Sequence, residues 1–222
     1  MGPESTIEYY RTIIALYHER KPDGSYPQLI INSIDLKKGM DFMAANDLAG
    51  AGRHLLDEIG KLSRAGADFG LIAANTPHIV FDDVASKSPI PLISIVEVTC
   101  AAAKDRGLKK PGLFGTRLTM QGTFYPKVFS CEGIELIVPD PDDQEYIHEK
   151  YLNELVPGNF LPETRAGLLA IVDRLKNKID IDGVILAGTE LPLIFRDATH
   201  NGVPFLSTMR IHAEAAVTEM LS

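Results

Sequence analysis

Two similar stretches, GLIAANTPH at residues 70–78 and GVILAGTELP at residues 183–192, decide how this sequence folds. Each is an apolar run that ends in small residues and a threonine, a pattern typical of a buried parallel strand followed by a tight turn. The two stretches begin 113 residues apart, and a second pair of motifs, PLIS at 91–94 and PFLS at 204–207, repeats at the same offset. A duplication of that length predicts two similar α/β lobes related by a pseudo-twofold axis.

Strands and helices alternate along the whole sequence, which predicts parallel sheets in an α/β fold. We expect residues 1–97 with 206–222 to form the first lobe, and residues 98–205 to form the second. Because open parallel sheets bind ligands at the carboxyl ends of their strands, we expect one ligand cleft between the lobes. The predicted strands cover residues 27–34, 67–75, 89–96, 110–116, 133–140, 181–189 and 203–208, and the main predicted helices cover 5–20, 46–65, 118–131, 142–155, 162–178 and 209–221.

Composition limits the classes of protein to which this chain can belong. Of its 222 residues, 45% are apolar and 23% are charged, which is ordinary for a globular protein and excludes a disordered chain. The net charge of -8 repels phosphate backbones, so nucleic acid is not an expected partner. No apolar run approaches the ~18 residues of a membrane helix, and no secretory signal is visible. Two cysteines make neither a disulfide framework nor a four-ligand zinc site, so we expect a protein of the reducing cytoplasm. No set of His, Cys, Asp and Glu has the spacing of metal ligands, and no Gly-x-Gly-x-x-Gly nucleotide fingerprint is present, so we expect neither a metal nor another cofactor.

The loop after the first repeated strand supplies the first candidate site residues. Asn75 and Thr76 follow small residues that let a ligand approach the backbone, and the helix that starts here suits a carboxylate. Alternatively, both residues only form the turn. His78 is either a general acid or base near neutral pH or a hydrogen-bonded helix residue.

The equivalent loop of the second repeat supplies Thr189 and Glu190, and Thr189 takes the position that Thr76 has in the first. Glu190 either orients a substrate ammonium or a catalytic group, or it stabilises the dipole of the helix that follows. Two further turns into helices resemble anion cradles. They contain Ser5 and Thr6 near the start of the chain, and Thr116 in the second half.

Together these motifs resemble the aspartate/glutamate racemase family. The resemblance rests on the MGPEST start, the AANTPH and AGTELPLI loops, the GLFGTRLTM turn and the terminal RIHAEAAV helix, in the family order over essentially the whole chain. It implies a homodimer of two-lobed subunits that holds a small anionic amino acid or dicarboxylate between the lobes, and an isomerase that needs no pyridoxal phosphate. The residues that cradle carboxylates remain, with His78 and Glu190 as acid–base candidates: Ser5, Thr6, Asn75, Thr76, Thr116 and Thr189.

The sequence departs from that family at two positions. The family's racemases have a cysteine before Asn-Thr in the first loop and before Thr-Glu in the second, where this chain has Ala74 and Gly188. Neither residue carries an acid–base group, so the two-thiol mechanism is not possible, and the loss of each positioned group costs ~10²–10⁴-fold in rate. Cys100 and Cys131 fall on predicted helices away from the strand ends, and we expect small buried or half-buried side chains there rather than replacements.

A further departure concerns the beginning of the chain. The family has an apolar strand and Gly-Gly before Met-Gly-Pro, whereas this sequence starts at Met1. In a doubly wound lobe the first strand is central. We therefore expect either a true start that lies upstream, or a lobe with a gap or a substitute at that strand.

Two functions stay open at this point. The first is an isomerase-like enzyme for small amino dicarboxylic or hydroxy acids, either a racemase or a divergent isomerase or lyase, in which His78 and Glu190 transfer protons. The second is a non-catalytic binding protein that keeps the dicarboxylate cleft and senses or sequesters a metabolite. The absence of both thiols favours the second function over ordinary racemisation.

Overall fold

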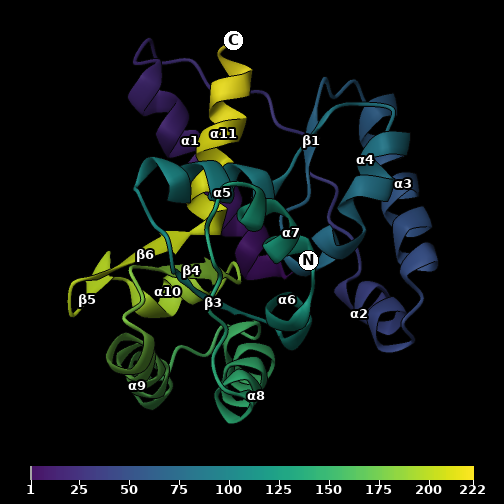
Figure 1. Cartoon of the computed structure of the whole chain (residues 1–222). Helices are drawn as coiled ribbons and strands as arrows, with labels where there is room; N and C mark the ends of the chain where they lie inside the picture. The colour runs from purple at the N-terminus through teal and green to yellow at the C-terminus, as the bar shows by residue number, and fades with distance from the viewer. Residues whose placement is uncertain (1) are drawn as a thin grey trace. The chain divides into compact units, whose positions relative to one another are not determined.

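The computed structural model describes residues 2–222, which divide into two compact units (Figure 1). The first unit contains the chain up to Ile95 together with His212–Ser222, and the second is Val96–Ile211. The chain passes from the first unit into the second within α5 (Ile95–Asp105) and returns within α11 (Thr208–Met220). Both units combine helices with parallel strand pairs, so the predicted α/β fold class is confirmed.

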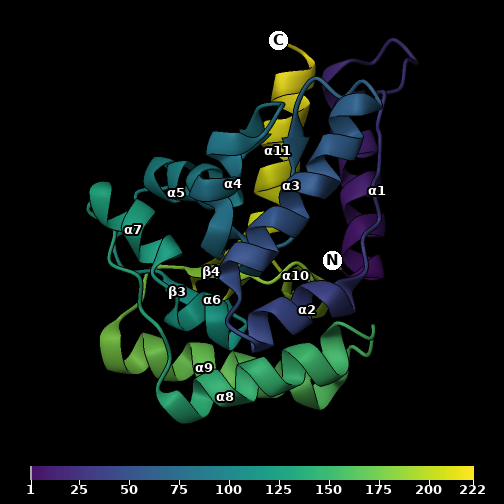
Figure 2. The same ribbon diagram turned by 90° about the vertical axis from the view of Figure 1, so that its right-hand side faces the viewer.

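The first unit contains a small parallel sheet with helices packed around it. Strand β1 (Gly70–Leu71) pairs in parallel with β2 (Leu92–Ile93). Helices α1 and α11 lie side by side (Figures 1 and 2), and the Tyr9 hydroxyl of α1 lies 2.9 Å from Nδ1 of His212 in α11. The other elements of this unit are α1 (Pro3–Arg20), α2 (Leu36–Ala44), α3 (Leu48–Arg64), the 3-10 helix η1 (Thr76–Val80) and α4 (Phe81–Lys87).

Two aspartates begin helices of the first unit. The Asp35 carboxylate accepts the backbone N–H of Lys37 at 2.9 Å and starts α2, which the sequence analysis did not predict. The Asp47 carboxylate accepts the N–H of Gly50 at 2.8 Å and starts α3. Both side chains satisfy donors that the first turn of a helix leaves without a partner.

The second unit is built on a larger sheet with the strand order β3-β4-β6-β5. The first three strands run parallel, and β5 pairs with β6 in the antiparallel sense at the edge. All residues of β3 and β4 are buried, as their continuous apolar runs predict, and α8 and α9 lie side by side against the sheet (Figure 2). The elements of this unit are β3 (Gly112–Gly115), α6 (Arg117–Gln121), α7 (Phe124–Cys131), α8 (Pro141–Lys150), the π-helical turn η2 (Tyr151–Leu155), α9 (Pro162–Ile179), β4 (Val184–Ala187), α10 (Leu191–Phe195), β5 (Thr199–His200) and β6 (Val203–Ser207).

Residues 27–34 differ most from their prediction. They form neither a strand nor a helix, and Ile30 and Ile31 are 46% and 52% exposed, so the prediction of a buried strand there is wrong. The local pattern is that of a strand, because half-buried and exposed positions alternate over most of the segment. What the segment lacks is a neighbouring strand, since β1 pairs only with β2 among the described residues.

Three other predicted strands are reduced to two residues or to a single bridge. The strands predicted at 67–75 and 89–96 contract to β1 and β2, which have two residues each. The segment 133–140 forms a single parallel bridge, between Ile137 and Gly112. Among residues 2–222, no helix is both long enough and apolar enough to cross a membrane.

Candidate functional site

In the first unit, the predicted site residues gather at the carboxyl end of β1. The Ser5 hydroxyl donates to the Ala73 carbonyl at 3.2 Å and so ties the start of α1 to the end of the strand. Asn75 is 4% exposed, and Thr76 is half-buried as the first residue of η1. The Thr6 hydroxyl donates to the carbonyl of Gly2, the N-cap residue of α1, at 3.3 Å.

His78 lies in the same loop, but both of its ring nitrogens bind the backbone. Its Nε2 atom accepts the N–H of Ile95 at 3.2 Å, which requires the proton on Nδ1, and Nδ1 lies 2.9 Å from the Ala74 carbonyl. Burial lowers the pKa of His78 to about 3, with a further contribution from nearby His212. The side chain is therefore a neutral imidazole that fixes the loop to the start of α5, and a catalytic role for His78 stays a prediction.

His212 forms a second buried imidazole that the sequence analysis did not identify. Its Nε2 atom lies 2.9 Å from the Ile93 carbonyl, and its Nδ1 atom accepts the Tyr9 hydroxyl. Burial lowers the pKa of His212 to about 4. The ring centroids of His78 and His212 are 6.3 Å apart. Because burial lowers both pKa values, two neutral histidines lie close together at this end of the sheet.

In the second unit, strand register brings the predicted residues to one edge. Gly115 of β3 is paired with Ala187 of β4, so the residues that follow them, Thr116 and Gly188, come next to each other at the carboxyl end of the sheet. The Thr116 hydroxyl accepts the N–H of Thr119 at 3.3 Å and caps α6. This capping role is enough to explain a threonine at position 116, so the residue does not by itself indicate a bound ligand.

Glu190 is buried at this edge, with 2% of its surface exposed. One of its carboxylate oxygens accepts both the Thr189 hydroxyl, at 2.8 Å, and the Tyr151 hydroxyl. Thr189 is also buried, with 4% exposed. The two hydroxyl donors stabilise a carboxylate that burial would otherwise destabilise.

Tyr151 is the residue of this edge that sequence reasoning missed. It belongs to η2, and its ring covers the backbone of Gly188, where a Cβ atom would lie 2.5 Å from Cε2 and 3.0 Å from Cζ of the ring. Burial raises the pKa of Tyr151 well above its usual value, and the charge of Glu190 raises it further. The glycine at 188 was the available signal, because it leaves space that another side chain can fill.

Neither cysteine lies at a strand end, as the sequence predicts. Cys100 is in α5 with 2% exposed, and burial raises the pKa of its thiol. Cys131 is the last residue of α7 and is exposed, which corrects the expectation of a buried or half-buried side chain. Within residues 2–222, no three His, Cys, Asp or Glu side chains are grouped in a way that would hold a metal ion.

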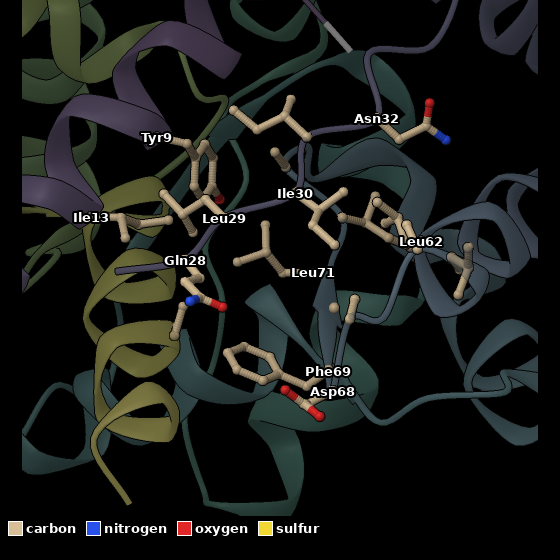
Figure 3. A pocket seen from close by; sticks show the side chains of 18 of the residues that line it. Tyr9, Ile13, Gln28, Leu29, Ile30, Asn32, Leu62, Asp68, Phe69 and Leu71 are labelled. Carbon is tan, nitrogen blue, oxygen red and sulfur yellow. The ribbon is translucent and has the colours of Figure 1, made fainter. Parts of the chain in front are cut away.

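A groove of about 690 Å³ lies within the first unit (Figure 3). Its walls come from α1, residues 27–34, α3, the strand β1 and α11. Of the eight predicted site residues, Thr6 alone lines it. The groove therefore reaches Ala73, next to the loop that carries Asn75 and His78, but none of residues 74–78 lines it.

Comparisons with known proteins place the chain in a family. A model of the Asp/Glu/Hydantoin racemase family matches residues 1–216. The "Broad specificity amino-acid racemase RacX" of Bacillus subtilis (strain 168) is 26% identical over 230 aligned residues, which cover 100% of this chain and 96% of that protein. An aspartate racemase homologue from Pyrococcus horikoshii OT3 is 32% identical with a TM-score of 0.83, covering 99% of this chain and 95% of that one.

A third relative agrees in fold. The aspartate racemase of Picrophilus torridus has a TM-score of 0.81 and 19% identity, with 99% of this chain and 90% of that chain covered. The family match and the full-length relatives support a racemase-like function. From the fold and from the match over residues 1–216, the chain belongs to the Asp/Glu/hydantoin racemase family.

Proposed function

We propose that this protein binds a small anionic amino acid, such as an amino dicarboxylic acid, and does not racemise it through a pair of thiols. The family supports an amino acid as the ligand, and the hydroxyl and amide side chains at the strand ends of each unit suit a carboxylate. Ala74 and Gly188 stand where the resemblance implies the two thiols, and neither can accept or return a proton. Binding is thus retained while the known route for proton transfer is lost.

One observation carries this proposal: both acid–base candidates are already bound to structural partners. His78 is neutral with both ring nitrogens on the backbone, and Glu190 accepts two hydroxyl groups in a buried position. A general base must reach the proton that it removes and must have a pKa near the working pH. His78, with a pKa of about 3, is a weak base at neutral pH.

A divergent isomerase or lyase is the second candidate, and Tyr151 favours it. The phenol lies against Gly188 and is bound to Glu190, an arrangement in which a carboxylate orients a proton donor. Because its pKa is raised, Tyr151 keeps its proton at neutral pH, so it cannot act as a base and is a weaker acid than an ordinary tyrosine. Racemisation needs a base on one face of the α-carbon and an acid on the other, so Tyr151 alone does not supply it.

Calorimetric titration tests the binding proposal. We expect saturable heat with an enantiomer of aspartate or glutamate and a weaker response with malate or maleate, which lack the amino group. Thr189→Val should lower the affinity about tenfold. It removes a hydroxyl that we assign to the ligand carboxylate, and this hydroxyl also holds the buried Glu190 in place. Thr199→Val changes an exposed threonine of the same unit and should leave the affinity unchanged. No heat with any of these acids would contradict the proposal.

A further inference from the structure

Helix α8 and the turn η2 that continues it direct one face to the carboxyl end of the sheet in the second unit. Positions 144, 148 and 151 are four and then three residues apart, a spacing that places side chains on one side of a helix. Helix α6, which follows β3 after one residue, lies next to α8 in both views (Figures 1 and 2). Contacts that hold this face to the strand ends are Gln121 with Gln144 at 3.0 Å, the Arg117 backbone with His148 at 3.2 Å, and Tyr151 with Glu190.

His148 is held by one ring nitrogen and presents the other. Its Nδ1 atom accepts the backbone N–H of Arg117, and a backbone N–H can only donate, so the proton of the neutral ring is on Nε2. Among residues 2–222, no group accepts a hydrogen bond from Nε2, and this atom is not buried although the residue is half-buried. His148 therefore offers an oriented hydrogen-bond donor at the end of β3.

The imidazole of His148 is neutral at pH 7. Burial lowers its pKa, and the Arg117 guanidinium lowers it further, against the opposing charges of Glu145 and Glu149. Protonation of Nδ1 would also break the hydrogen bond from the Arg117 backbone. A neutral imidazole whose second nitrogen is fixed by a backbone N–H can donate to an oxygen of a ligand without carrying a charge itself.

Other donors at this edge already have an acceptor. The hydroxyl groups of Tyr151 and Thr189 both donate to one oxygen of Glu190. A carboxylate that binds beside them needs a further donor, because a charge removed from water without hydrogen bonds is costly. Strand register brings the end of β3, where the ring of His148 is held, next to the end of β4, which these hydroxyls follow. His148 is thus placed to supply that donor.

We infer that His148 is a ligand-binding residue of the second unit, and that its Nε2–H donates a hydrogen bond to a carboxylate oxygen of the bound amino acid. This inference rests on the proposed function and adds the group that receives one carboxylate at the end of β3. Arg117 then has a positioning role, because its backbone N–H fixes the ring and the tautomer.

Two substitutions of His148 separate ligand binding from a purely structural role. His148→Asn keeps an acceptor near the position of Nδ1 but removes the donor, so calorimetric titration with aspartate and glutamate should show an affinity about tenfold lower. His148→Gln places a side-chain amide near the position of Nε2 and should keep the affinity within about threefold of the natural chain. If the imidazole only holds the start of α6, the order is reversed, with Asn tolerated and Gln weakened. That reversed order, or equal affinities for all three proteins, would overturn the inference.

His200→Asn is the matched control. His200 is a half-buried histidine of the same unit that binds Asp173 beside the amino end of β6, away from the carboxyl end of the sheet, so its substitution should leave the affinity unchanged. If the natural chain binds an acid and His148→Asn binds it equally well, the inference fails while the proposed function stands. If the natural chain gives no heat with any of the acids, both fail.

Proton–nitrogen NMR of the imidazole rings gives a second readout. Saturation with aspartate should shift the Nε2 signal of His148, while Nδ1 keeps the shift of an unprotonated nitrogen that accepts a hydrogen bond. The signals of His200 should not move. A bound acid that leaves the His148 Nε2 signal in place, or a free protein in which Nδ1 carries the proton, would overturn the inference.

Discussion

The ring of Tyr151 occupies the space in which a side chain of residue 188 would begin, because a Cβ atom on Gly188 would lie 2.5 Å from Cε2 of the ring. Real Cβ atoms essentially never approach another atom so closely. Glycine at 188 and tyrosine at 151 therefore depend on each other. A side chain at 188 displaces the ring, and with it the hydroxyl that Glu190 accepts.

Gly188→Cys should destabilise the second unit, because the new side chain overpacks the space that Tyr151 fills. Overpacking of a buried site costs about 1–3 kcal/mol. We expect a melting temperature lower by about 2–4 °C per kcal/mol, the range for chains of about 150–250 residues. Differential scanning calorimetry measures the shift, and Gly39→Cys is the control, since a Cβ at Gly39 meets no atom within 4 Å.

The same substitution should be less costly when the ring is removed. In a double-mutant cycle, Gly188→Cys in a Tyr151→Ala background is expected to cost less than in the natural chain, with a coupling energy of about 0.5–3 kcal/mol between residues in contact. Strictly additive effects would show that the ring does not occupy the space above Gly188.

Tyr151→Phe keeps the ring and removes only its hydroxyl. Glu190 then keeps the Thr189 hydroxyl but loses the second donor, and a buried charged acceptor that loses a hydrogen bond costs about 1–3 kcal/mol. Urea denaturation should show a lower midpoint with an unchanged slope. Tyr26→Phe, at a position that is 67% exposed, should leave the midpoint unchanged. Equal midpoints for the two variants would mean that the Tyr151 hydroxyl does not stabilise the carboxylate.

Stability should fall as the pH falls from about 6.5 toward 4. The pKa values of His78 and His212 are about 3 and about 4 in the folded protein, against an ordinary value of 6.5. In this window the unfolded chain binds protons that the folded chain does not, so each histidine removes stability by ~1.4 kcal/mol per pH unit at most.

Substitution of a histidine distinguishes its contribution to the pH dependence of stability from that of the carboxylates, which also titrate in acid. His212→Asn should reduce the slope of the free energy of unfolding against pH between 6.5 and about 4.5, whatever its effect at pH 7.5. Thr218→Ala, in the same helix, should shift the free energy without changing that slope. An unchanged slope in His212→Asn would contradict a buried neutral imidazole at that position.

Parts of the fold whose local pattern and packing agree could be predicted from the sequence. The apolar run of β4 and the capped, periodic sequence of α3 are examples, and the repeat gave the two-unit α/β class. The failure at residues 27–34 has a physical cause. A strand depends on its neighbours, and a segment with strand-like alternation stays unpaired where no neighbour is present.

The candidate site was predictable only where its residues are close in the sequence. Thr189 and Glu190 adjoin, and so do Asn75 and Thr76, so the repeated loops were sufficient to find them. Tyr151 reaches Glu190 across 39 positions, and His212 reaches Tyr9 across 203. Such contacts depend on how helices pack on the sheets, which no local spacing records.

Exchange of the α-proton in D₂O, followed by proton NMR, tests the central claim most directly. Both enantiomers of aspartate and glutamate, with malate and maleate, are incubated with the natural chain. We expect the α-proton signals to persist while the signals of a bound acid broaden. Loss of an α-proton signal together with the appearance of the other enantiomer would contradict the claim, because it would require proton transfer without thiols at positions 74 and 188.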